Sequence, residues 1–491
     1  MGYSQTILPA HGRHGLGMLR FRRQTLLLFV LCVGGIAAAQ KAPPVANLPW
    51  NASAATQQLK APAQIAPSIA LDPAKLYTLS ELVDIAEQNN PETRVAWQNA
   101  KARASDLGIT KSTLYPTMAA VALAESSRQG VFFGPYFVRQ TVEAYSPAFI
   151  LDYSIFDLQR SQEIAISRNN LLAANFQFND THRRVIFQVM SAYYRLLDDK
   201  GLEEAAEANL KNATTVREAA EDRLKHGLAT LPDVLEARSA EAQADYDLQA
   251  AIGNTEIAHG DLANALGISP TVQFRVESIH EIKLPDKIVD TVESSIDKAL
   301  AQRPDLMQRV AQLRATGAEV KSAQRAYAPK VSFYGNGGEV RAYGVQNNMP
   351  GVYSPTLQTW DARLSVTWTL FDGLARENRL AKAHADQKQA QASIDAIRDQ
   401  IEDQVWAAYS TARTALRQQK AAAALLEAAT ESYNAALESY NYGLRSQIDV
   451  VSAQRTLAGA RSEDVTARAN LLTGLAALAY QTGDLLHGKT P

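Results

Sequence analysis

The histidines, the cysteine and one glycine-rich segment are the residues with which this sequence could carry out chemistry. Eight histidines are scattered along 491 residues without an H-x-x-x-H pair, and the only cysteine is Cys32, so the spacing of a metal site is missing. No G-x-S-x-G nucleophile elbow or Walker loop occurs. The segment GNGGE, Gly335–Glu339, lies within a predicted strand and opens no helix, which argues against phosphate binding. We therefore expect no enzymatic activity, no cofactor and no bound metal.

The first 39 residues read as a secretory signal peptide. A basic stretch precedes an apolar run from Leu26, and three alanines precede the expected cleavage between Ala39 and Gln40. The apolar run is shorter than the roughly 20 residues of a spanning helix, which disfavours the alternative of a membrane anchor. Leu31 precedes Cys32 where lipoprotein signals carry a small residue, which disfavours lipidation, and translation from Met18 instead of Met1 stays open.

The rest of the chain has no cysteine. It is mildly acidic: the formal charge of the full sequence is −2, and removing the four arginines of the signal peptide lowers it to about −6. This balance gives no reason to expect nucleic acid as a partner. Residues 40–75 are rich in alanine and contain six prolines, which predicts an extended N-terminal linker.

After the linker the chain repeats itself. The segments that end at Pro116 and Pro329 match, and so do LDYSIFD and VTWTLFD, and then HGLATLPDVLEA and YGLRSQIDVVSA. We divide the chain into a first repeat at 76–270, an inter-repeat linker at 271–290, a second repeat at 291–483 and a tail at 484–491. This is one unit duplicated rather than a solenoid of short repeats.

Each repeat has two strands with one apolar and one polar face. They are expected at about 117–126 and 147–156 in the first repeat, and at about 330–341 and 360–371 in the second. Such alternation is typical of a strand in a transmembrane β-barrel, although a soluble sandwich shows it too. Four strands cannot close around a lumen and open edges are not tolerated in lipid, so several chains must share one barrel.

A helical stretch of roughly 70 residues follows the strands of each repeat, and a glycine turn and a returning helix of about 35 residues come next. These helices are rich in alanine and polar residues. The composition suits the wall of a water-filled tube, because small side chains let helices pack closely; it also permits an ordinary soluble coiled coil.

The ordered duplication resembles the TolC-like outer membrane efflux protein family over about Leu76 to Gly483. It is carried by the strand-to-helix pairs Phe156-Asp157 and Phe371-Asp372 and by the two glycine turns. The resemblance implies a mostly α-helical fold with a transmembrane β-barrel, in which a homotrimer forms a twelve-stranded barrel in the outer membrane lipid and an α-helical barrel in the periplasm. It also implies a passive exit duct of a tripartite efflux or type I secretion system. The implied partners are a periplasmic adaptor protein and an inner-membrane pump driven by protons or ATP.

The resemblance also assigns roles at the two helix turns. Gly227-Leu228 and Gly443-Leu444 are expected at the adaptor-facing tips. Tyr440, Arg445, Asp449 and Asp233 match positions that hold the periplasmic gate shut in the family, with Arg445 and Tyr440 expected to contact Asp233. Pro232 and Ser452 depart from the family pattern, so the latch is expected to differ. A purely structural role for Asp449, as an acid in the first turn of a helix, stays open beside the gate.

Two questions stay open on the sequence alone. The alternative function is a soluble periplasmic coiled-coil scaffold or adaptor, which the two-faced strands disfavour. The cargo and the identity of the pump have no signal in the sequence.

Overall fold

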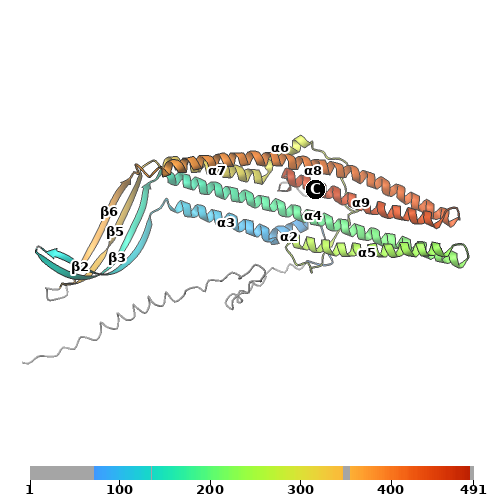
Figure 1. Ribbon diagram of the computed structural model, residues 1–491, viewed down its shortest axis with the longest axis horizontal. Helices are drawn as coiled ribbons and strands as arrows, with labels where there is room; N and C mark the ends of the chain where they lie inside the picture. Colours follow the sequence, from blue (N-terminus) through green and yellow to red (C-terminus); the bar gives the residue numbers. More distant parts are fainter. Residues whose placement is uncertain (1–70, 134, 347–353, 487–491) are drawn as a thin grey trace, which may run out of the picture. The chain divides into compact units, whose positions relative to one another are not determined.

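The computed structural model describes residues 71–133, 135–346 and 354–486, and the two repeats follow one another in it (Figure 1). The predicted signal peptide, its cleavage site and most of the N-terminal linker lie outside the described residues. The elements of the first repeat are α2 (Leu79–Asn89), α3 (Pro91–Ser112), β2 (Thr117–Phe133), β3 (Tyr136–Phe156), α4 (Leu158–Lys225) and α5 (Leu231–Ala265). Those of the second are α6 (Val292–Gln302), α7 (Pro304–Arg325), β5 (Lys330–Gln346), β6 (Thr356–Thr367), α8 (Ala375–Asn441) and α9 (Gln447–Thr482). The short elements β1 (Leu76–Tyr77), β4 (Arg275–Val276) and η1 (Asp484–Leu486) complete the described chain.

The long helices have the predicted lengths. Helices α4 and α8 contain 68 and 67 residues, and the returning helices α5 and α9 contain 35 and 36. The aspartate of each strand-to-helix pair accepts a hydrogen bond from an amide in the first turn of the long helix. Asp157 accepts a hydrogen bond from the Gln159 amide (2.9 Å), and Asp372 accepts one from the Arg376 amide (3.1 Å). Both contacts satisfy amides that the first helical turn leaves free.

The four long strands form one antiparallel sheet in the order β2-β3-β5-β6. Three strands are longer than predicted: β2 runs on to Phe133 and β3 starts at Tyr136, where a loop was expected, and β5 runs on to Gln346. The return strand of the first repeat was expected at about 147–156. Strand β3 instead continues through Pro147, and the neighbouring Gly338 makes room, because a Cβ at that position would collide with the Pro147 carbonyl.

Strand β6 begins and ends about four residues earlier in the chain than predicted. It runs from Thr356 to Thr367 and ends four residues before Phe371, the predicted end. Its repeat equivalent β3 continues to Phe156, which matches Phe371. The difference has a physical reason: β3 is paired on both sides, whereas β6 is an edge strand paired with β5 alone.

The helices follow the order of the strands. Helix α4 packs against α3 and α7 near the sheet, and against α5 and α9 farther along, while α8 packs against α7 and α9 (Figure 1). Consequently β2, α3 and α5 of the first repeat lie along one edge of the chain. Strand β6 and helix α8 of the second repeat lie along the opposite edge.

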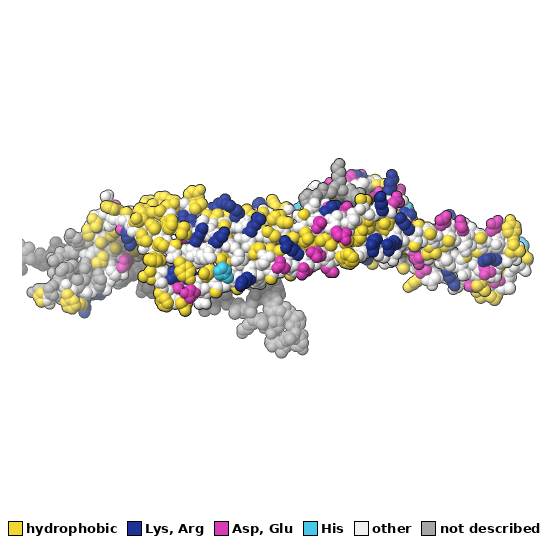
Figure 2. Space-filling view, turned by 90° about the horizontal axis from the view of Figure 1, so that it is seen from above, with side chains coloured by type: hydrophobic (Ala, Val, Ile, Leu, Met, Phe, Trp, Pro, Cys, Tyr) yellow, Lys and Arg dark blue, Asp and Glu magenta, His cyan; other side chains and the backbone are white. Residues whose placement is uncertain are grey.

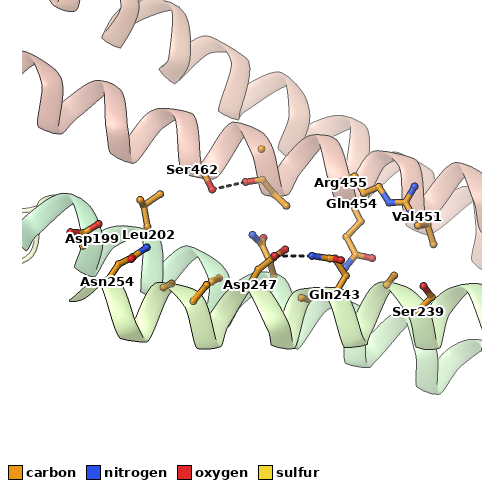
Figure 3. Close-up of a pocket in the computed structure, with 18 residues that line it drawn as sticks. Asp199, Leu202, Ser239, Gln243, Asp247, Asn254, Val451, Gln454, Arg455 and Ser462 are labelled. Carbon is orange, nitrogen blue, oxygen red and sulfur yellow. Dashed lines mark hydrogen bonds between the residues drawn. The ribbon is translucent and has the colours of Figure 1, made fainter. Parts of the chain in front are cut away.

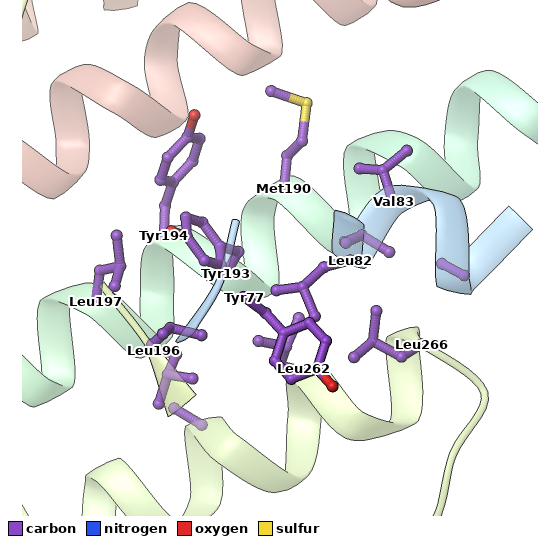
Figure 4. Close-up of a cluster of buried hydrophobic side chains, with 14 of the residues drawn as sticks. Tyr77, Leu82, Val83, Met190, Tyr193, Tyr194, Leu196, Leu197, Leu262 and Leu266 are labelled. Carbon is purple, nitrogen blue, oxygen red and sulfur yellow. The ribbon is translucent and has the colours of Figure 1, made fainter. Parts of the chain in front are cut away.

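The largest hydrophobic core surrounds the middle of α4. Met190, Tyr193 and Leu197 are fully buried there against Leu82 of α2 and Leu262 of α5 (Figure 4). The segment predicted as an inter-repeat linker, 271–290, packs into this core: Phe274, Val276 and Ile279 are buried, and β4 pairs in parallel with β1. The alternation that would have revealed β4 is only two residues long, too short to recognise.

No helix within the described segments combines the length and the apolar character needed to cross a membrane.

Candidate functional site

The two helix turns have the same backbone geometry. In the first, the Gly227 amide donates to the Leu224 carbonyl (3.0 Å) and the Leu228 amide to the Arg223 carbonyl (2.8 Å). The second turn repeats both bonds with Gly443 and Leu444 as donors. The two glycines have φ of +74° and +76°. This is the Schellman ending of a helix, which needs a residue that tolerates the left-handed conformation. The predicted glycine turns are therefore confirmed as turns.

Asp233 and Asp449 cap the returning helices. The amide and hydroxyl of Thr230 both donate to Asp233 Oδ2 (2.8 and 2.7 Å), and Ser446 holds Asp449 Oδ2 in the same way (3.0 and 2.8 Å). These hydrogen bonds stabilise the charged form and lower the pKa of both carboxyl groups. The capping role that the sequence left open for Asp449 is therefore real. Pro232 lies in the first turn of α5, where a helix needs no amide from it.

The contact between the two tips differs from the predicted one. Tyr440 does not reach Asp233: it is buried, its ring lies under the Arg223 guanidinium at 4.2 Å, and its carbonyl accepts a hydrogen bond from Arg223 Nη1 (2.7 Å). Within the described part of the chain, Arg445 is exposed and forms no ion pair with Asp233. The sequence did not single out Arg223, because nothing local distinguishes it from the other arginines of α4.

Both tips expose apolar side chains. Leu228 is 70% exposed and Leu444 79%. Tyr442 and Ile448 extend the apolar surface of the second tip. Grouped apolar side chains in water mark surfaces that another protein covers. The tips therefore combine a hydrogen-bonded glycine turn with an apolar surface and two capping carboxylates.

At the other end, the sheet has one apolar and one polar face. On the apolar face Phe149 and Leu151 lie opposite Gly337 and Gly335, whereas Asp152, Tyr334 and Arg363 form one row on the polar face. Exposed aromatic side chains mark the junction with the helices, and they include Tyr115, Trp368 and Phe371. Figure 2 shows apolar side chains gathered at this end and charged side chains spread over the helices. A lipid-facing sheet with aromatic residues at its border has this pattern.

Comparison with known proteins agrees with this arrangement. The family model described as outer membrane efflux protein matches residues 82–268 and 295–484, one segment for each repeat. The chain belongs to the outer membrane efflux protein family. Protein CyaE of Bordetella pertussis is 26% identical over 409 residues, which cover 83% of this chain and 84% of that protein. The probable efflux pump outer membrane protein TtgC of Pseudomonas putida is 23% identical, covering 84% of this chain and 85% of its own length. The structure of the outer-membrane channel OprN aligns with a TM-score of 0.71 at 21% identity, covering 85% of this chain and 95% of that one.

These findings confirm the resemblance to TolC-like outer membrane channels and the fold that it implies. The protein is an efflux channel component of the outer membrane and extends into the periplasm, as predicted. Among the described residues, no group of three or more potential ligand side chains could hold a metal ion.

A cleft lined by both polar and apolar side chains runs along this efflux protein between α4, α5 and α9, with a volume of about 510 Å³ (Figure 3). Gln454 is buried beside it, and its Oε1 has no hydrogen-bond partner in the described chain. Asp199 Oδ2 is likewise buried without a hydrogen bond and lies 3.8 Å from Arg195 Nε. Burial raises the pKa of Asp199. Gln243 and Asp247, joined by a 2.8 Å hydrogen bond, line the opposite wall. The unpaired oxygens can accept hydrogen bonds from water or from another donor.

Among the described residues, the edge strands β2 and β6 are each paired on one side only, and both edges of the chain expose apolar side chains. Met118 of β2 and Trp360 of β6 are 76% and 83% exposed on the two edge strands. Val95 of α3, Tyr246 of α5 and Trp406 of α8 are also exposed on the edge helices. An edge strand that faces lipid must be paired, since no water satisfies its backbone there.

Proposed function

We propose that three copies of this chain assemble into one conduit that serves as a passive exit duct across the outer membrane and periplasm. The unpaired edges carry this proposal, because β2 of one copy and β6 of the next complete each other only if the sheets join into a ring. Two different edges that meet head to tail generate a closed ring when the rotation is right. Three copies of four strands make twelve, within the range of known outer membrane barrels.

The duct would work with a periplasmic adaptor and an inner-membrane pump. The name of TtgC describes an efflux pump outer membrane protein, which supports a pump as partner here. The exposed Leu228 and Leu444 form the surface that we assign to the adaptor. A drug efflux system and a type I secretion system are equally compatible with these tips.

We assign the resting closure of the duct to the same tips. Within one copy, Arg223 and Tyr440 join the two tips. Between copies, the exposed Arg445 is available for the carboxylate of Asp233, whose Oδ1 accepts no hydrogen bond within the described chain. The planar guanidinium suits such a carboxylate, and Asp449 would add negative charge at the entrance.

Native mass spectrometry of the purified protein in detergent, followed by conductance recording in planar bilayers, tests the proposal. Three chains per particle and discrete ion conductance are expected. A monodisperse monomer, or a trimer that never conducts, would contradict it. The alternative of a soluble periplasmic scaffold predicts a protein that carbonate washes from membranes, whereas a channel stays in the membrane.

A further inference from the structure

We infer the register in which β6 of one copy pairs with β2 of the next, and with it an ion pair between Arg363 and Glu125 of neighbouring copies. The inference rests on the proposed trimer and names the contact that closes it. It follows from the duplication, because β3 and β5 join the two repeats inside one chain and already show how such units pair. We call this junction of the two repeats the inner seam.

The two hairpins have identical registers. In the first hairpin Thr117 lies opposite Asp152. In the second Lys330 lies opposite Thr367. Lys330 is the repeat equivalent of Thr117, since each follows the matched proline by one residue, and Thr367 is the equivalent of Asp152, since each precedes the matched Phe-Asp pair by the same distance. The duplication therefore preserves strand pairing residue by residue.

The register of β3 with β5 then predicts the register of β6 of one copy with β2 of the next. Inside the chain, β3 pairs with β5 so that Asp152 faces Tyr334 and Ala148 faces Gly338. Replacing each strand by its repeat equivalent turns this seam into β6 of one copy against β2 of the next. The first pair becomes Thr367 opposite Val121. The second becomes Arg363 opposite Glu125.

The charges on the two edges agree with this register. Arg363 and Glu125 would point to the polar face of the sheet, directly opposite each other, where an ion pair adds to strand pairing. Glu125 is exposed and forms no ion pair in the described chain. Arg363 is 66% exposed and contacts Asp361 on its own strand (2.8 Å) and the Tyr334 ring (4.8 Å). On the other face, Val366 meets Ala122 and Leu364 meets Ala124, so apolar residues stay together.

Paired cysteines test the register, in a chain whose only cysteine lies in the predicted signal peptide. Ser365→Cys with Leu123→Cys probes the polar face, and Val366→Cys with Ala122→Cys probes the apolar face. The matched controls join Ser365→Cys with Val121→Cys or with Glu125→Cys. A shift of two residues moves the facing side chain by about 7 Å, beyond disulfide reach, so we expect about tenfold less cross-linking in the controls. The readout is covalent trimer on a denaturing gel after oxidation.

A charge swap tests the ion pair separately. Arg363→Glu and Glu125→Arg should each lower the fraction of trimer that survives heating in detergent, and the double variant should recover it. Asp361→Ala is the control for the contact within β6, and it should leave the trimer intact. Equal loss in the single and double variants would overturn the pair.

The outcomes separate the register from the trimer. Cross-linking at the inferred pairs supports both. Cross-linking at the shifted pairs, or none in a protein that native mass spectrometry shows to be trimeric, overturns the register and leaves the proposed function standing. A monomeric parent protein overturns both.

Discussion

The seam between the two repeats and the open edges of the chain are equivalent in backbone but not in side chains. At the seam, fully buried Arg183 of α4 forms a 2.6 Å ion pair with Asp180 and donates to the Tyr480 carbonyl of α9 (3.2 Å). Its repeat equivalent on α8 is Asp399, which is exposed along the open edge. Duplication has thus preserved the geometry of packing, whereas the buried ion pair of Arg183 has no equivalent on α8.

The tips show the same difference. Arg223 and Tyr440 join the two turns of one chain, whereas the equivalent positions toward the next copy hold Ser439 and Leu224. Neither of these residues can form the charged contact. We conclude that the contact inside a chain is fixed by Arg223 and Tyr440, and that the contact between chains depends on other residues, among them Arg445.

The largest effect on efflux is expected at the two tips, whose backbone geometry is the same in both repeats. Leu228→Asp combined with Leu444→Asp places charge on both apolar tips and should abolish efflux, because a desolvated apolar contact would have to bury two carboxylates. Cell accumulation of an efflux substrate measures the loss. Val289→Asp, at an apolar residue that is 82% exposed outside the tips, is the matched control and should be silent. Normal efflux in the double variant would remove the tips from the partner surface.

A change at the inner seam should affect stability most. Arg183→Leu leaves Asp180 and Asp305 without their shared partner and should cost about 3 kcal/mol, the lower range for breaking a buried pair. Arg184→Leu is the control: its ion pair with Glu92 has side chains 46% and 50% exposed, and its loss should cost at most about 1 kcal/mol. The midpoint of thermal unfolding by circular dichroism compares them. Equal shifts would mean that the seam gains nothing from the buried charge.

Arg223→Ala should raise single-channel conductance several-fold, because it frees Tyr440 and lets the tips of one chain separate. Arg238→Ala is the control: its partner Glu221 lies in the same repeat (2.8 Å), so conductance should stay at the parent value. Tyr440→Phe should change little, since Tyr440 meets Arg223 through its ring and its carbonyl. Combining Tyr440→Phe with Arg445→Ser should open the duct, because the double variant lacks the Arg445 guanidinium. A silent double variant would place the latch elsewhere.

The smallest effect concerns the entrance charge. Asp449→Asn should weaken block by multivalent cations, and Asp395→Asn, an acid far from the tip on α8, should not. Because hydrogen bonds from Ser446 lower the pKa of Asp449, its charge and capping contribution are present above the ordinary carboxyl pKa of about 4 and are lost only as pH falls through the lowered value. Block in the parent should therefore be unchanged between about pH 7 and 5. Relief of block already within that range would contradict the role of Asp449.

The sequence by itself determined the duplication, the lengths of the long helices, the glycine turns and the residues at both tips. Those features depend on interactions within a few residues, such as the Schellman bonds of Gly227 and the cap of Asp233 by Thr230. Tertiary structure alone decided that Tyr440 meets Arg223 rather than Asp233, that β3 continues through Pro147 beside Gly338, and that Val276 of the expected linker joins the core. Each of these rests on a partner far away in the chain, 217 residues for Arg223 and Tyr440. Local periodicity carries no information about such a partner, because only packing brings the two segments together.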